Sequence, residues 1–120
     1  MENVSISDQL ESIRSLQSTV SKLKNALSQM NQSGANTTLV KKRLQAVSIG
    51  LSMLEHVWNQ SPHHHGQEEL AAARHVINGL LPSIQNSYAK SKAGSPQRTL
   101  LERRMRALEL AVQAIDDYTS

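Results

Sequence analysis

The sequence predicts an all-α protein, an antiparallel up-down-up-down four-helix bundle built from two tandem helical hairpins. Along most of the chain, apolar residues recur at alternating spacings of three and four, which is typical of helices packed in a bundle. The chain has no Phe, one Trp and two Tyr, so the aromatic side chains favoured in strands are scarce. A repeat within the sequence, described below, divides the predicted helices into two pairs.

The first helix is expected from about Ser5 to Gln32. Ser5 or Ser7 can cap its first turn, because a serine hydroxyl accepts a hydrogen bond from a free backbone N–H at a helix start. The polar segment 31–36 contains Gly34 and predicts a turn. The apolar residues follow one heptad pattern: Ile6, Ile13, Leu16, Val20, Leu23, Leu27 and Met30.

The second helix is expected to begin after an N-cap at Thr37 or Thr38 and to end near Asn59, because Pro62 follows a polar cluster. It repeats the spacing of the first helix. Its core-facing residues are predicted to be Val40, Leu44, Val47, Leu51, Leu54 and Trp58.

The third helix is expected to begin near Gln67 and carries Gly79 and Pro82 in its interior. A proline removes one backbone donor and clashes with the preceding turn, at a cost of about 3 kcal/mol in a helix interior. The sequence therefore predicts a kink or a break near Gly79–Pro82. The fourth helix follows Ser95 as N-cap and Pro96 at the first helical position.

An internal repeat relates the second and fourth helices. Thr, Leu, Arg and Ala are identical at positions 38, 39, 43 and 46 and again 61 positions later, at 99, 100, 104 and 107. The apolar pattern alone would arise in any two core helices, but these identities would not. We predict one domain, residues 1–120, with repeats at about 5–60 and 67–119. The alternative is an extended pair of hairpins that completes its core by dimerising or exchanging helices.

Composition argues against an enzyme. Without Cys there is no thiolate nucleophile, and the five Gly are scattered, so no loop is suited to cradle a phosphate. Serine occurs without the glycine-flanked turn of hydrolases. We expect a non-catalytic protein without a cofactor. Met1-Glu2-Asn3 begins no signal peptide, and no apolar run approaches the ~20 residues that span a bilayer, so a cytoplasmic protein without membrane contact is expected.

Histidines are concentrated in one region, at His56, His63, His64, His65 and His75. This region would lie at one end of a bundle, near several glutamates. Imidazole and carboxylate ligands suit Zn, Ni or Fe, so His63, His64, His65 and His75 are candidate metal ligands. The alternative is a polar, histidine-rich turn without a metal.

Basic residues cluster near the starts of the second and fourth helices, where cations oppose the helix dipole. The candidate partner-binding residues are these cations and the proline of the third helix: Lys41, Lys42, Arg43, Arg103, Arg104, Arg106 and Pro82. The leading hypothesis is an adaptor or regulator that binds another protein, and homodimerisation is left open. A nucleic-acid partner is the weaker alternative, because the net charge is only +3 and no aromatic residues interleave with the cations to stack on bases.

Overall fold

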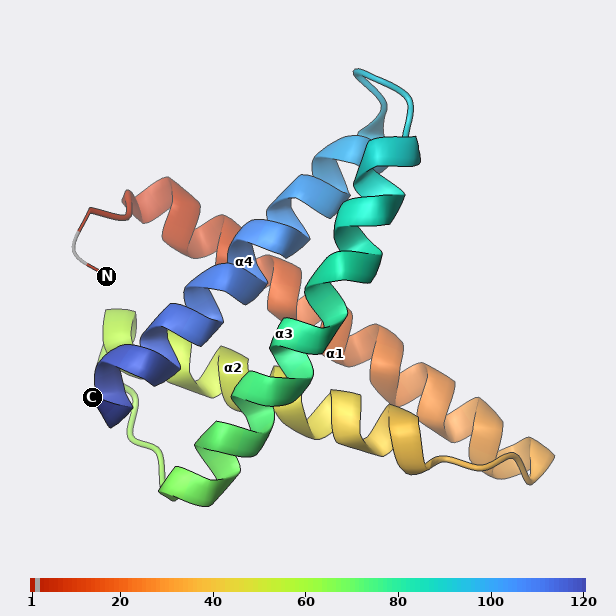
Figure 1. The fold of residues 1–120 in the computed structure, drawn as a ribbon, viewed down its shortest axis with the longest axis horizontal. Coiled ribbons are helices and arrows are strands. Elements are labelled where there is room, and N and C mark those ends of the chain that lie inside the picture. Colours follow the sequence, from red (N-terminus) through yellow and green to blue (C-terminus); the bar gives the residue numbers. More distant parts are fainter. Residues whose placement is uncertain (2) are drawn as a thin grey trace.

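The computed structural model describes residues 1 and 3–120, which form four helices joined by short connections (Figure 1). The helices are α1 (Ile6–Ser33), α2 (Thr38–Asn59), α3 (Gln67–Lys90) and α4 (Pro96–Thr119). The described residues contain no strand. The prediction of an all-α fold with four helices is confirmed.

Short polar residues and glycine define several helix ends. The Ser5 hydroxyl accepts the backbone N–H of Asp8 at 3.1 Å at the start of α1, and Gly34 ends this helix in the left-handed conformation with φ 75°. The Ser95 hydroxyl likewise caps α4. Thr37 is the N-cap residue of α2, as predicted, but its side chain makes no capping hydrogen bond. The Asn36 side chain accepts the backbone N–H of Thr38 instead.

α3 is one continuous helix through Gly79 and Pro82, so the alternative of two shorter helices is wrong. Both residues are exposed. Water can therefore solvate the carbonyl that loses its partner at the proline, and the helix continues with one hydrogen bond fewer.

The two hairpins cross each other. Within each hairpin the two helices run in opposite directions, whereas the α1–α2 pair and the α3–α4 pair point along different diagonals (Figure 1). The molecule measures 42 × 38 × 21 Å. α2 and α4 contact each other, and each also contacts both α1 and α3; among the described residues α1 and α3 do not meet. α2 and α4 are thus the central pair.

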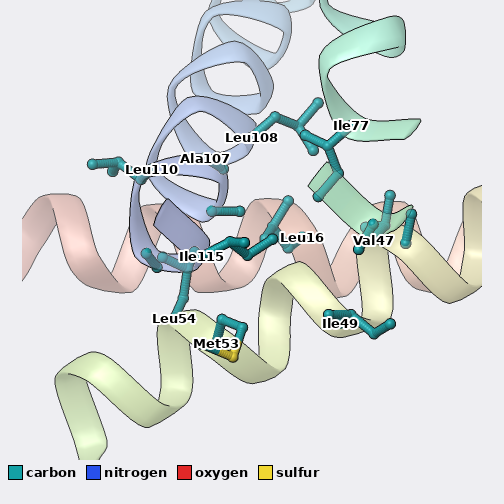
Figure 2. Packing of buried hydrophobic residues seen from close by; sticks show 14 of the residues in the cluster. Leu16, Val47, Ile49, Met53, Leu54, Ile77, Ala107, Leu108, Leu110 and Ile115 are labelled. Carbon is teal, nitrogen blue, oxygen red and sulfur yellow. The ribbon is translucent and has the colours of Figure 1, made fainter. Parts of the chain in front are cut away.

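All four helices contribute to one core. Val47, Met53 and Leu54 of α2 pack with Leu108 and Ile115 of α4, and residues from the outer helices complete the cluster (Figure 2). These outer residues are Leu16 of α1 and Leu70, Ala73 and Ile77 of α3, all of them buried.

The heptad pattern predicted too much burial for α1. Of its seven heptad residues only Leu16 is fully buried, and Ile6 is 75% exposed. α1 runs beside α2 in the opposite direction and crosses α4, and its ends extend beyond this crossing (Figure 1).

Burial follows the spacing of 61 residues noted in the sequence. Every buried residue of α1 and α2 has a buried counterpart 61 positions later, in α3 or α4. Leu16 corresponds to Ile77, and Val47 to Leu108. Gly50 corresponds to Ala111, and these two face each other: a Cβ added at Gly50 would lie 3.1 Å from the Cβ of Ala111. The central helices therefore cross at equivalent small residues.

Candidate functional site

Two similar surface units lie near the starts of the central helices. In α2 the unit is Leu39, Lys42 and Arg43; in α4 it is Leu100, Arg103 and Arg104. Spacings of three and four place the cations one turn from the leucine on the same helix face. Leu39 is 59% and Leu100 is 51% exposed. We call these the two Leu–basic units.

The structure does not merge the two units into one patch, because they lie on different hairpins beside different grooves. Lys42 lines a groove of about 340 Å³ between α2 and α3, the α2–α3 groove. Arg103 and Arg106 line a groove of about 510 Å³ between α1 and α4, the α1–α4 groove. Lys41 is exposed beside the first unit, and Pro82 is exposed on α3 outside both grooves.

The two grooves occupy equivalent places but differ in chemistry. Asp8 in the α1–α4 groove corresponds to Glu69 in the α2–α3 groove, 61 positions later. Glu11 corresponds to Ala72, and Arg103 to Lys42 in the same way.

Charge fills the first groove, where Arg103 Nη2 lies 3.5 Å from Glu11 Oε1 and further carboxylates come from Asp8, Glu102 and Glu109. The second groove has an apolar floor, which includes Ile49 and Val76, and a charged rim.

Three of the histidines meet at the end of the molecule where the α2–α3 connection passes the end of α4. The His56 and His63 rings are 4.6 Å apart and perpendicular, and the His63 and His65 rings are stacked at 5.4 Å. Tyr118 of α4 lies against His63 at 4.7 Å and His56 at 5.8 Å. We call these four residues the histidine cluster.

Most ring nitrogens of the cluster have partners on the chain. His56 Nδ1 lies 2.9 Å from the Ser61 carbonyl oxygen, which only a protonated nitrogen can satisfy. The two nitrogens of His65 lie 3.2 Å from Glu69 Oε2 and 3.2 Å from the Ser52 hydroxyl. His63 Nδ1 accepts the backbone N–H of His65.

The pKa of His63 is lowered below its usual value of 6.5. The main cause is burial, followed by the nearby charges of His56, His65 and His64. The cluster as it stands therefore favours neutral imidazole at His63.

The four predicted metal ligands do not come together. His63 and His65 are neighbours, His64 is exposed, and His75 lies along α3 in the α2–α3 groove. In residues 1 and 3–120, no three His, Asp or Glu side chains are grouped as metal ligands. The arrangement has the features of a hydrogen-bonded turn.

Several of these residues could not be identified from the sequence. Tyr118 and Ser52 join the histidines only through the fold, and no local pattern marks them. The exposure of Leu39 and Leu100 was not predicted, although a signal existed: the two leucines are identical across the repeat, and Leu39 lies off the apolar face predicted for the second helix.

Comparisons of this chain with protein-family models, curated proteins and solved structures give no match. No helix in the described part of the chain is both long and apolar enough to cross a bilayer.

Proposed function

We propose that this protein is a non-catalytic adaptor or regulator, located in the cytoplasm, that binds an acidic segment of another protein through its Leu–basic units. One observation carries the proposal: an exposed leucine with two cations one turn away occurs at equivalent positions of both halves. Core packing accounts for identities at buried positions. It does not account for Leu39 and Leu100, which are 59% and 51% exposed.

The chemistry of each unit suits a protein partner. An exposed leucine offers apolar area that gains free energy when covered, about 25 cal/mol per Å² of apolar surface. The neighbouring cations attract carboxylates and increase the rate of encounter with an acidic surface. Nucleic acid is a weaker candidate, since no aromatic side chain lies in either unit to stack on a base.

We also infer that the two halves arose by duplication of one helical hairpin. The matching burial at a spacing of 61 residues supports this inference, as do the crossing at Gly50 and Ala111 and the equivalent grooves. A duplicated hairpin would carry its binding unit twice, which gives the adaptor two separate contact points. Two contacts on one partner would strengthen binding through their high effective concentration.

The test is affinity capture with the full-length chain from extracts of its source organism, followed by mass spectrometry. A variant with Leu39→Ser and Leu100→Ser should lose the partner that the unchanged chain recovers. A matched control carries Ile6→Ser and Leu10→Ser, which alter apolar residues that are 75% and 49% exposed outside the units. This control should recover the partner as well as the unchanged chain does.

The recovered partner should contain an acidic segment, and its affinity should fall as salt is added, because screening weakens exposed charge pairs. The proposal fails if the leucine variant recovers the same proteins in the same amounts as the control. It also fails if the proteins lost by that variant bind only through nucleic acid, which nuclease treatment of the extract would reveal.

A further inference from the structure

A second concave surface between α1 and α4 is strongly basic. Its volume is about 320 Å³, and it adjoins the α1–α4 groove, with which it shares Glu11 and Arg103. Arg14 and Lys22 line it from α1, and Arg103 and Arg104 from α4. We call this surface the basic groove.

Cations outnumber carboxylates here by four to one, the carboxylate being Glu11. Glu11 lies 3.5 Å from Arg103 and is already engaged. Within residues 1 and 3–120 no ion pair is formed by Arg14, Lys22 or Arg104. Like charges held together on facing helices repel one another, so an external anion bound between them would relieve a real electrostatic cost.

Arg104 provides an independent observation. Its Nε atom is shielded from solvent and has no hydrogen-bond partner. Buried donors are nearly always paired, and one without an acceptor on the chain is explained by local strain or by a bound water molecule or ion. Arg104 thus brings to the groove wall a guanidinium group whose Nε atom has no acceptor from the described chain.

We propose that the basic groove binds a multiply charged phosphate group. Guanidinium groups match phosphate oxygens with paired N–H donors, and lysine adds a compact charge. The hydroxyls of Ser15 and Ser18 also line the groove and can donate to further oxygens. The volume lies at the small end of the range for ligand sites, which suits a phosphate or diphosphate group better than a large organic molecule.

The other half of the molecule lacks the outer-helix cations of this site. Arg14 and Lys22 correspond, 61 positions later, to His75 and Ser83. One phosphate site per chain is therefore expected. The α4 wall of the basic groove is the α4 Leu–basic unit, so a phosphate and an acidic segment would share Arg103 and Arg104. The proposal goes beyond the adaptor function, and its test changes α1 residues that belong to neither Leu–basic unit.

Isothermal titration calorimetry of the full chain with inorganic pyrophosphate tests the proposal, at about 0.1 M salt, where the Debye length is about 10 Å. We expect one site per chain. The double variant Arg14→Gln, Lys22→Gln should weaken binding at least about tenfold, because charged hydrogen bonds are worth about that factor or more. A control with equal loss of charge elsewhere, Lys24→Gln and Lys90→Gln, should bind within about twofold of the unchanged chain, the effect of distant screened charges being small.

Glu11→Gln should tighten pyrophosphate binding several-fold, because it removes the carboxylate that repels the anion and competes for Arg103. Loss of structure cannot produce this gain. A parallel titration with ADP separates two sources of the phosphate: equal affinities indicate the free anion, and tighter ADP binding indicates an organic diphosphate. Absence of pyrophosphate binding at millimolar concentration overturns the proposal, as does an equal loss of affinity in the control or an unchanged affinity in Glu11→Gln.

Discussion

Replacement of Gly50 by alanine tests whether the two central helices cross as closely as the structure indicates. The added Cβ would lie 3.1 Å from the Cβ of Ala111 and 3.1 Å from Cδ1 of Ile77. The end of the Ile77 side chain can rotate away. The Ala111 Cβ moves only with the backbone of α4, so the two helices would have to separate by a few tenths of an ångström.

Two opposing terms set the magnitude. Alanine is favoured over glycine in a helix interior by about 0.8–1.0 kcal/mol. Overpacking of a closed core costs about 1–3 kcal/mol. We therefore expect Gly50→Ala to lower the free energy of unfolding by about 1 kcal/mol. Adding Ala111→Gly moves the single methyl to the other helix, so the double variant should be less destabilised than the sum of the single variants, by about 1 kcal/mol.

Urea unfolding, followed by helical circular dichroism and by the fluorescence of Trp58, measures these changes. The control is Gly79→Ala in α3, where an added Cβ meets nothing within 4 Å. That substitution should raise the free energy of unfolding by up to about 1 kcal/mol. If Gly50→Ala stabilised the protein as Gly79→Ala does, the close crossing would be wrong, and so would the central position of Gly50 and Ala111.

Three further predictions concern the histidine cluster and a helix cap. Because the pKa of His63 is lowered in the folded protein, the unfolded chain binds a proton more readily as the pH falls through 6.5. The free energy of unfolding should therefore decrease as the pH falls in this window, and His63→Gln should flatten this dependence in urea titrations. An unchanged dependence would exclude His63 as its source. Ser95→Ala should cost about 1 kcal/mol and Ser95→Gly only a few tenths, because glycine is nearly as good an N-cap; equal losses in urea unfolding would contradict this. Because the imidazoles of the cluster already have hydrogen-bond partners, stoichiometric Zn²⁺ should leave the melting temperature unchanged. A rise in melting temperature that His63→Gln abolishes would restore the metal hypothesis.

Helix limits were predictable because local residues determine them. Gly34 takes the left-handed conformation that other residues avoid, and Ser95 places its hydroxyl on a free backbone N–H. Pro82 does not break α3. Its cost depends on whether the freed carbonyl is solvated, and α3 leaves Pro82 exposed.

The crossing of the hairpins could not be predicted from periodicity. A heptad pattern shows which face of a helix is apolar, but not how much of that face another helix covers. In α1 the covered part surrounds Leu16, and Ile6 lies beyond it. The crossing depends on a feature without periodicity, the small side chains at Gly50 and Ala111 that allow close approach.

The candidate sites were predictable only where their residues are adjacent in the chain. His63 and His65 were found as neighbours in sequence, whereas Tyr118 reaches them from the end of α4. The cations Arg103 and Arg104 were found as a cluster, whereas Arg14 and Lys22 join them across the contact between α1 and α4. No local sequence pattern identifies Arg14 and Lys22 as members of a site, because exposed cations are common on any amphipathic helix.

The proposed duplication indicates where the two halves have acquired different chemistry. The central helices contribute most of the buried residues, and their equivalent positions remain small or apolar, since each change there would disturb the core. The outer helices bury few residues, so differences between the halves disturb the core less there. Glu11, Arg14 and Lys22 of α1 stand where α3 has Ala72, His75 and Ser83. The α1 side of the molecule is therefore charged, whereas the α3 side carries a groove with an apolar floor. A ligand that binds only one half should contact its outer helix.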